Sequence, residues 1–404
     1  MTPPPSAGAP PAWAPPAPRF GGPAPDWPAW QEGGRVRGIV LAGSYYAGEG
    51  VFEQLLRGPL LPVAQRPVIC FPLAWLRDGS VPHAVICANS STPMVRRALG
   101  DGAPMGIALS YYADEEPRGP AGCARDAALL APADTYVLVE GATVPLVDLR
   151  ALLAAHRRAG AAATMVVEVD RRRAAVDGAR RASPGGVYVF ERRVLEGVPA
   201  AGFQDIKQGL LERLYAAGEP VHVHEVQGLS PRVLDYASYA AVSAWLIATA
   251  GRRHEFRDWL PLGEGLRHPT AEVDPGARVV GPVLVGPGAR VGAGAVLVGP
   301  VSLGAHSLVE AGALVSRSSV WERCRVGAGA VVDASLLAHG VDVAPGRRVM
   351  GGIEVVDRAG QVADVLGAQV EPWAAPAPGR APDPRVPEEF TLFPGGLVPR
   401  GAAA

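Results

Sequence analysis

The fold of this chain is decided by residues 285–308, which read VGPGARVGAGAVLVGPVSLGAHSL. Aliphatic residues recur there at every sixth position, and the same spacing runs from Val273 to Val315. A period of six fits neither the turn of a helix nor the alternation of a strand, so it indicates a repeat architecture. One face of a triangular coil takes about six residues, with the aliphatic side chain inward and a small residue at the corner. The stretch therefore predicts a left-handed parallel β-helix built from hexapeptide repeats.

The repeat slips by one residue after Val315 and then resumes. The later inward positions are Val320, Val326, Val332, Val343, Val349 and Val355. At about 18 residues per coil, the whole stretch predicts roughly four to five coils.

Composition sets the class of protein. The 404 residues exceed what one core usually holds, so we expect two domains and tails. The 38 basic and 39 acidic residues give a net charge of −1, which offers no electrostatic case for nucleic acid or an anionic membrane. Lys207 is the only lysine, so nearly all positive charge is carried by arginine.

The four cysteines are scattered and show no CxxC spacing, which predicts free buried thiols. The chain start has no signal-peptide pattern, and no apolar run reaches about 18 residues. We therefore expect a soluble cytoplasmic protein.

Buried strands and amphipathic helices alternate in the first half of the chain. RVRGIVLAG (35–43), PHAVICAN (82–89) and TYVLVEGA (135–142) are typical of strands, and PLVDLRALLAAHRRAG (145–160) of a helix. This alternation predicts a doubly wound α/β sheet that binds ligands beyond the carboxyl ends of its strands. The expected organisation is a disordered Pro/Ala-rich arm (1–34), an α/β domain (35–250), a connector (251–266), the β-helix (267–356) and a Pro-rich tail (357–404).

Five segments, taken in order, carry a family resemblance. They are PLLPVAQRPVICFPLAWLRDGSV (59–81), EEPRGPAGCARDA (115–127), GGVYVF (185–190), QGLSPRVLDYASY (227–239) and SSVWERCRVGAGAVVDASLLAHGVDVAPG (318–346). With the LAG turn at 41–43, they resemble the sugar-1-phosphate nucleotidyltransferases, also called NDP-sugar pyrophosphorylases, and look most similar to GDP-mannose pyrophosphorylases. The resemblance implies an α/β nucleotide-diphospho-sugar transferase domain in front of the β-helix. It also implies transfer of a nucleotide from a nucleoside triphosphate to a sugar 1-phosphate, with release of pyrophosphate.

That reaction brings two anions together, so it needs backbone amides, cationic side chains and, in the family, Mg²⁺ on acidic ligands. The family loop LAGGxGTRL reads LAGSYYAGEG here (41–50), where Gly48 replaces the arginine. The family lysine falls at Gly58, so Arg57 and Arg66 are the nearest candidates for a catalytic cation. Arginine is not equivalent to lysine at a crowded phosphate, because its guanidinium is a rigid planar fork.

The family's two metal-binding aspartates correspond to Ala142 and Arg232. Neither supplies the carboxylate oxygen that Mg²⁺ prefers, and arginine repels the ion. Loss of about 4 kcal/mol of metal stabilisation slows a reaction roughly 10³-fold. Glu140 and Asp235 are the replacement ligands to consider, since Glu140 lies on the same strand face as Ala142. Mg²⁺ is accordingly expected only if the protein is an active enzyme.

The binding positions implied by the resemblance are better kept than the catalytic ones. For the nucleotide they are Leu41, Ala42, Gly43, Ser44, Gly119, Ala121, Gly122, Glu140 and Gly141. For the sugar they are Gly186, Tyr188 and Asp205.

Three functions stay open at this point. The losses favour a catalytically degenerate paralogue that binds a nucleotide-sugar and regulates or scaffolds a partner. The alternative is an active, divergent NDP-sugar pyrophosphorylase that serves polysaccharide synthesis. A minor alternative is a β-helix acyltransferase that uses His306 or His339 as a general base. In each case the coil edges predict a homo-oligomer or hetero-oligomer.

Overall fold

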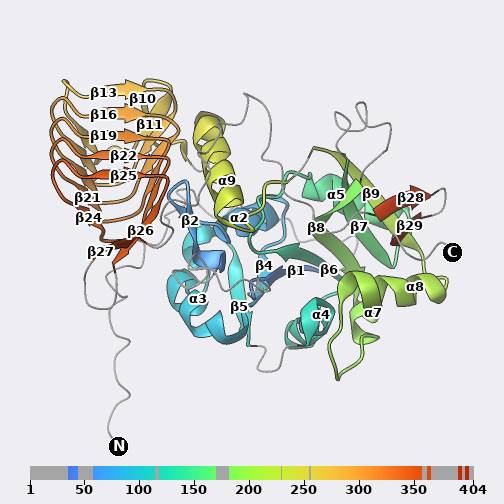
Figure 1. Ribbon diagram of the computed structural model, residues 1–404. Helices are drawn as coiled ribbons and strands as arrows, with labels where there is room; N and C mark the ends of the chain where they lie inside the picture. Colours follow the sequence, from blue (N-terminus) through green and yellow to red (C-terminus); the bar gives the residue numbers. More distant parts are fainter. Residues whose placement is uncertain are drawn as a thin grey trace, which may run out of the picture.

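The computed structural model describes residues 35–43, 58–113, 118–169, 182–228, 230–253, 256–356, 362–364, 390–393 and 396–399. An α/β part and a coil of short strands lie side by side, and helix α9 (Tyr236–Thr249) stands between them (Figure 1). This is the α/β domain followed by a β-helix that the sequence predicts.

One mixed sheet forms the centre of the α/β part, in the order β29-β28-β8-β6-β1-β4-β5, with β7 paired to β8 and to β9. Its strands are β1 (Val36–Leu41), β4 (His83–Cys87), β5 (Ala108–Tyr112), β6 (Thr135–Glu140), β7 (Ala163–Val169), β8 (Ala182–Glu191), β9 (Val221–Gln227), β28 (Phe390–Phe393) and β29 (Gly396–Pro399). Strands β6, β1, β4 and β5 are mutually parallel, which puts the carboxyl ends of β1 and β6 at one edge. Strand β8 runs antiparallel to β6 and β7, an orientation that the sequence pattern does not indicate.

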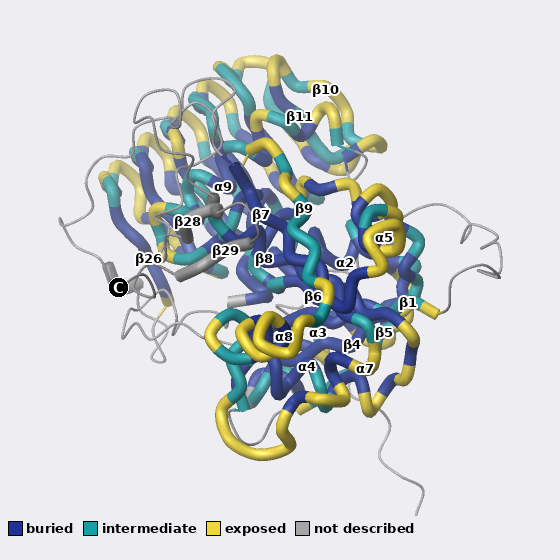
Figure 2. Tube along the Cα trace, turned by 90° about the vertical axis from the view of Figure 1, so that its right-hand side faces the viewer, coloured by how far each residue is buried: buried dark blue, intermediate teal, exposed yellow. Residues whose placement is uncertain are grey.

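Helices cover both faces of this sheet. They are α2 (Cys70–Asp78), α3 (Thr92–Leu99), α4 (Gly119–Leu130), α5 (Leu149–Arg158), α7 (Arg192–Glu196), the π-helical η4 (Ile206–Leu211) and α8 (Glu212–Ala216). Short 3-10 turns are η1 (Gly58–Leu60), η2 (Asn89–Ser91), η3 (Ala103–Met105) and η5 (Ala250–Arg252), and β2 (Pro62–Val63) pairs with β3 (Arg66–Pro67). Figure 2 shows the central strands buried and the outer side of α5 exposed. Such strands read as unbroken apolar runs because both of their faces are covered.

The coil consists of three parallel sheets whose strands stack in rungs. The first face holds β11 (Gly265–Arg267), β14 (Val283–Val285), β17 (Val301–Leu303), β20 (Ser319–Val320), β23 (Leu336–Leu337) and β26 (Ile353–Val356). The second holds β12 (Glu272–Val273), β15 (Arg290–Val291), β18 (Leu308–Val309), β21 (Arg325–Val326) and β24 (Asp342–Val343). The third holds β13 (Arg278–Val280), β16 (Val296–Val298), β19 (Leu314–Ser316), β22 (Val331–Asp333) and β25 (Arg348–Met350).

The slip in the repeat has a structural cause. Early rungs are 18 residues apart, as in the pairing of Arg290 with Leu308, whereas later rungs are 17 apart, as in Leu308 with Arg325. Leu337 occupies the inward position between Val332 and Val343, which valine spacing alone does not reveal, and it is 0% exposed. Each later coil thus loses one corner residue while its inward side chains stay stacked.

The coil also begins earlier than expected. Strand β10 (Leu260–Leu262) forms a hairpin with β11, and β11 pairs in parallel with β14. Part of the predicted connector (251–266) therefore belongs to the first face of the coil. Within the predicted tail (357–404), β27 (Val362–Asp364) pairs with β26, and β28 joins the edge of the α/β sheet at Ala182.

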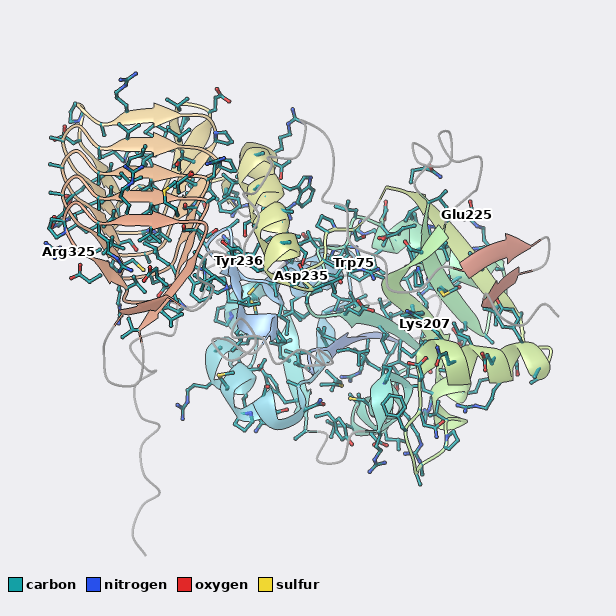
Figure 3. The ribbon with its side chains drawn as sticks, viewed as in Figure 1. Trp75, Lys207, Glu225, Asp235, Tyr236 and Arg325 are labelled. Carbon is teal, nitrogen blue, oxygen red and sulfur yellow. The ribbon has the colours of Figure 1, made fainter. Side chains whose placement is uncertain are left out.

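Helix α9 joins the two parts through a shared core. The Tyr239 hydroxyl donates to the Pro62 carbonyl at 2.9 Å, and the Trp321 indole donates to the Tyr239 oxygen at 2.9 Å. Val242 and Leu246 of the same helix are 0% exposed and lie in one apolar cluster with coil residues. Figure 3 shows Tyr236 on the side of α9 that meets the coil.

Two compositional expectations can be compared with the structure. Cys70, Cys87, Cys123 and Cys324 are all free and buried, as predicted. Among the described helices, none combines the length and apolarity that a bilayer crossing needs.

The aliphatic side chains that point into the coil should contribute most of its stability. Leu303→Ala removes a side chain that is 0% exposed, and we expect it to lower the free energy of unfolding by about 2–5 kcal/mol. The matched variant Leu308→Ala, at a partly exposed position of the next strand, should cost less than about 1 kcal/mol. Urea unfolding of both variants measures the difference. Equal losses would show that the inward row does not form the core.

Candidate functional site

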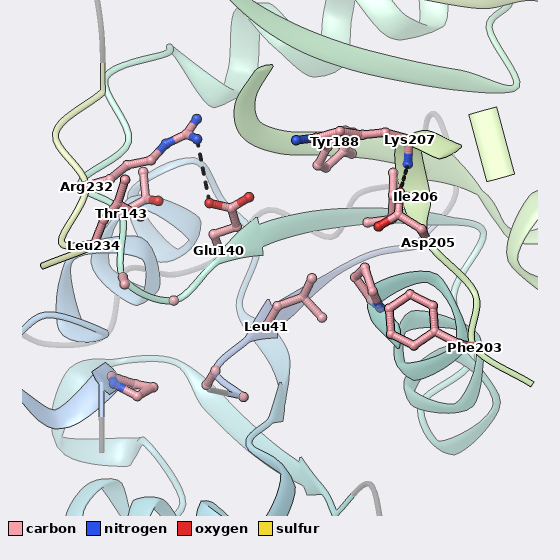
Figure 4. A pocket seen from close by; sticks show the side chains of 16 residues that line it. Leu41, Glu140, Thr143, Tyr188, Phe203, Asp205, Ile206, Lys207, Arg232 and Leu234 are labelled. Atoms are coloured by element: carbon pink, nitrogen blue, oxygen red, sulfur yellow. Dashed lines mark hydrogen bonds and ion pairs between the residues drawn. The ribbon is translucent and has the colours of Figure 1, made fainter. Parts of the chain in front are cut away.

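A cavity of about 330 Å³ opens at the carboxyl ends of β1 and β6 (Figure 4). Its size lies within the range of small-molecule sites. It is lined by Leu41, Ala42, Gly43, Pro59, Pro120, Glu140, Gly141, Ala142, Thr143, Tyr188, Phe203, Asp205, Ile206, Lys207, Arg232 and Leu234. Parallel strands of an open sheet commonly bind ligands beyond this edge.

Ala142 and Arg232, which the sequence resemblance matches to metal ligands of the family, both line this cavity. The segment around residue 232 returns beside the end of β6, where Thr143 and Arg232 form an antiparallel bridge. The amide of Val233 donates to the carbonyl of Ala142 at 2.9 Å. Backbone hydrogen bonds therefore hold Ala142 and Arg232 next to each other. Two residues that bind the same metal ion need such an arrangement.

The Arg232 guanidinium lies between two carboxylates. Its Nη1 is 3.8 Å from Oε2 of Glu140, and its Nη2 is 3.8 Å from Oε2 of Glu168. Nη2 also donates to the carbonyl of Pro184 at 2.5 Å. The side chain is 18% exposed, so this positive charge faces both the protein interior and the cavity.

Glu168 is the buried member of this group. It lies on β7 with 3% exposure and accepts a hydrogen bond from the Ser230 amide at 2.8 Å. Burial raises the pKa of the Glu168 carboxyl above its usual range, while the Arg232 charge and the Ser230 hydrogen bond oppose that rise. Sequence reasoning missed Glu168, because the strand pattern of 161–170 predicts only an apolar run.

The residues present at this position do not fit Mg²⁺. A carboxylate remains at Glu140, but a guanidinium stands where the second ligand would be. At about 4 Å and an effective dielectric of 20, a divalent ion and a guanidinium repel by roughly 8 kcal/mol. Within the described residues, no group of three or more His, Cys, Asp and Glu side chains is arranged to hold a metal.

Lys207, the only lysine in the chain, lines the same cavity. It is the second residue of η4, whose first turn is capped by Asp205, since Oδ1 of Asp205 accepts from the amides of Lys207 at 2.7 Å and Gln208 at 2.8 Å. In Figure 4 the Lys207 side chain extends from the Asp205 side of the cavity toward the side of Arg232. The cavity is therefore lined by two cationic side chains, Lys207 and Arg232. They are 25 residues apart in the sequence, so composition alone does not show that they line the same cavity.

Phe203 is an unusual residue at the mouth of the cavity, because it is 64% exposed. Large aromatic side chains are costly to leave in water, and an exposed ring beside a cavity is suited to stack on a planar ligand or a sugar face. No local sequence pattern distinguishes it from a loop aromatic.

Two of the predicted sugar-binding residues lie on β8. Tyr188 lines the cavity and is 2% exposed. Gly186 has φ +64°, and a Cβ at that position would come within 2.8 Å of Oε2 of Glu140. A glycine is required there so that Glu140 can approach the backbone.

The other predicted positions lie elsewhere or outside the described residues. Gly119, Ala121 and Gly122 do not line the cavity; they dock α4 on Gln204, whose carbonyl accepts from Ala121 at 2.9 Å. Arg66 also lies outside it, on the β2–β3 hairpin with its guanidinium 5.4 Å from the Phe256 ring centre. Ser44 and Arg57 are not among the described residues.

Asp235 is also away from the cavity. Its carboxylate caps α9 by accepting the amide of Ser238 at 2.7 Å. Figure 3 shows Asp235 at the start of α9, well apart from Lys207. This placement leaves Glu140 as the single acidic replacement ligand at the site.

The histidines of the coil do not form an obvious general base. His339 packs against Trp321, with ring centres 5.0 Å apart. Burial lowers the pKa of His339 to about 4, with a smaller effect of the Arg323 charge, and a base of that pKa is weak at neutral pH. His306 lies at a coil corner with φ +58°.

Comparisons with known proteins agree with this fold. Residues 54–176 match the Nucleotidyl transferase family model. A mannose-1-phosphate guanylyltransferase of Mycobacterium tuberculosis is 26% identical over 255 residues, which cover 56% of this chain and 68% of that protein. The chain is thus similar to sugar-1-phosphate nucleotidyltransferases, and the match to the family model lies within its α/β part.

Two further comparisons differ in how much of the other chain they cover. A glucose-1-phosphate thymidylyltransferase of Mycolicibacterium smegmatis is 38% identical over 90 residues, or 21% of this chain and 30% of that protein. A crystal structure of a putative glucose-1-phosphate thymidylyltransferase from Bacillus anthracis in complex with sucrose covers 52% of this chain and 94% of its own, with 18% identity and a TM-score of 0.45.

The pairing of Arg232 with Glu168 should make stability depend on pH. Burial raises the pKa of the Glu168 carboxyl in the folded chain above its unfolded value. The stability that this shift contributes to the folded state is therefore fully present below the unfolded pKa, and it is lost as the pH rises through the folded pKa. Arg232→Ala removes the opposing charge, so the folded pKa rises further and the loss at neutral pH grows. We expect the variant to lose about 1–3 kcal/mol of unfolding free energy at neutral pH and clearly less near the ordinary Glu pKa.

Denaturant unfolding at the two pH values measures this difference. As a control, Arg232→Ala made in a Glu168→Gln background should show no pH dependence from this pair, since glutamine keeps the acceptor for Ser230 without the charge. Equal destabilisation at both pH values in the Glu168 background would contradict the assignment.

Proposed function

We propose that this nucleotidyltransferase relative binds a nucleoside diphosphate-sugar in the cavity at the ends of β1 and β6 and acts as a regulatory or scaffolding paralogue, without catalysing nucleotidyl transfer. The observation that carries the proposal is the Arg232 guanidinium, which occupies a family metal position and is ion-paired to Glu140 and Glu168. A cation that is part of the chain can attract a diphosphate without Mg²⁺, but it cannot bring a triphosphate and its leaving pyrophosphate into a metal complex.

The remaining lining residues support binding of this ligand class. Lys207 and Arg232 supply N–H donors on two cationic side chains, which can contact the oxygens of a diphosphate bridge. Glu140 is 39% exposed and Asp205 lines the opposite side, so carboxylate oxygens are available to sugar hydroxyls. The exposed ring of Phe203 offers a stacking surface for the base or the sugar.

The relatives suggest which ligands to try first. They are named for guanylyl transfer to mannose 1-phosphate and thymidylyl transfer to glucose 1-phosphate. GDP-mannose and dTDP-glucose are accordingly the first two probes. Assembly of the chain with itself or with an active partner through the coil stays a prediction.

We expect isothermal titration to detect binding of at least one of these probes, with the same Kd in Mg²⁺ and in EDTA. Lys207→Ala should weaken binding at least about tenfold, because a charge-assisted contact contributes about 1.5–3 kcal/mol. Phe203→Ala should weaken it by a factor of several, whereas Tyr215→Ala, which removes an exposed aromatic ring of α8 outside the cavity, should have no effect. Binding that disappears in EDTA would contradict a metal-independent site.

The second candidate function is an active, divergent pyrophosphorylase. One observation favours it. Lys207 and Arg232 line the same cavity and provide two cationic side chains for phosphate oxygens, although the loop arginine and the lysine of the family pattern are absent here. An active enzyme of this kind would stabilise the leaving pyrophosphate with side chains alone.

A turnover assay separates the two functions. With Mg²⁺ and a panel of nucleoside triphosphates and hexose 1-phosphates, we expect no release of pyrophosphate above background from the unaltered protein. The double variant Ala142→Asp, Arg232→Asp places two carboxylates beside Glu140 and Glu168, and it should gain Mg²⁺-dependent thermal stabilisation that Arg232→Gln does not show. Pyrophosphate release by the unaltered protein would establish the second function instead.

A further inference from the structure

A second cavity, of about 450 Å³, lies at the amino ends of β1 and β4. It is bounded by the start of β1, the turn after α2, the start of β4 and one face of α5. The six residues of β1 separate it from the nucleotide-sugar cavity, because Val36 lines one and Leu41 lines the other. At about 3.3 Å per residue, the five steps from Val36 to Leu41 place the two sites roughly 17 Å apart.

Positive charge dominates this second cavity, which we call the basic bowl. Arg35, Arg37, Arg150 and Arg157 line it together with His83, and none of its lining residues is acidic. This is unusual in a chain whose net charge is −1. Guanidinium groups that face one cavity without counter-charges repel each other, and an anion in the cavity relieves that repulsion.

Three aspartates that are close in sequence to the lining residues accept hydrogen bonds from other groups. Asp78 accepts from Nε of Arg77 at 2.8 Å, and Asp134 accepts from the backbone amide of Arg35 at 2.7 Å. Asp148 caps α5 by accepting the amide of Arg150 at 2.9 Å. In these hydrogen bonds the donors are Arg77 and two backbone amides, not the guanidinium groups of the basic bowl.

Helix α5 is built to present its cations to this cavity. Arg150, Leu153, Ala154 and Arg157 have the spacing i, i+3, i+4 and i+7 and therefore share one face. Arg150 is held in place, since its Nη2 donates to the carbonyl of Asp78 at 3.2 Å and to Oγ of Ser80 at 2.8 Å. By contrast, the guanidinium groups of Arg37 and Arg157 make no hydrogen bond or ion pair with another residue that the structure describes, which leaves them available to a ligand.

The pKa of His83 is also affected by the positive charge of this cavity. Burial lowers the pKa of its imidazole, and the charge of Arg37 lowers it further. The ring is therefore neutral at pH 7 and can donate or accept a hydrogen bond beside the arginines.

We propose that the basic bowl is a binding site for a small organic phosphate, distinct from the nucleotide-sugar cavity. Guanidinium forks match phosphate oxygens in geometry and charge. Ala154, which is exposed between the two arginines of α5, offers an apolar contact for the carbon skeleton that carries the phosphate. No residue of this site lines the first cavity, so the proposal does not depend on the function assigned there.

The test uses ADP and inorganic pyrophosphate as probes and titrates them into the full chain. We expect saturable binding of ADP below about 5 mM, with an affinity that falls at least about tenfold in the double variant Arg37→Gln, Arg157→Gln. Pyrophosphate, which lacks the organic part, should bind more weakly than ADP and lose affinity in the same variant. Lys207→Ala should leave the affinity of the basic bowl for ADP unchanged. This result distinguishes binding in the basic bowl from binding in the first cavity, which Lys207 lines.

A charge-matched control excludes a general electrostatic effect. Arg278→Gln with Arg348→Gln removes the same net charge from exposed positions of the coil and should leave ADP affinity unchanged. Thermal melting without ligand checks that both double variants are folded. Equal losses in the two double variants, an affinity that depends on Lys207 alone, or the absence of saturable ADP binding would each overturn the proposal.

Discussion

The backbone pairing of residues 231–233 with the end of β6 is the contact on which the site and the assembly of the two parts depend. The amide of Val144 donates to the Pro231 carbonyl at 2.8 Å, and the amide of Val233 donates to Ala142. This pairing fixes Arg232 against Ala142 inside the cavity. It also aims the chain into α9, which begins at Tyr236 and packs against the coil through Tyr239 and Trp321. A change in this pairing would therefore disturb the cavity and the junction with the coil together.

Charge inside the cavity is balanced within the chain. Glu168 is buried on a central strand, where an unpaired carboxylate would be costly, and Arg232 is the cation that opposes this cost. The same guanidinium pairs with Glu140 at the cavity surface. In a metal-dependent site the ion would supply that charge, and its absence would leave carboxylates facing each other. Here a side chain supplies it, so the cavity has its counter-charge whether or not Mg²⁺ is present.

Much of the fold could be predicted because its signals are local. The six-residue spacing identifies the inward rows of the coil directly, and the apolar runs identify β1, β4 and β6. The antiparallel direction of β8 and the position of Leu337 could not be found in this way, since both depend on which strand lies alongside. At the site, resemblance to a family singles out Ala142 and Arg232, and the fold brings them together. Glu168, Phe203 and Lys207 were missed as site residues because their roles come from packing between segments that are distant in sequence.

The position of Arg232 gives a physical reason to expect that one substitution does not recover the family's chemistry. Replacing it with aspartate alone would restore a ligand, yet it would place that carboxylate near Glu168 and Glu140 with no permanent cation between them. Bound Mg²⁺ would then have to offset three carboxylates, one of them 3% exposed, before any substrate entered. The present arrangement avoids that cost, because the arginine and the buried glutamate stabilise each other in the folded chain. The two residues thus form one unit, and as long as both are present the guanidinium disfavours a divalent cation at this position.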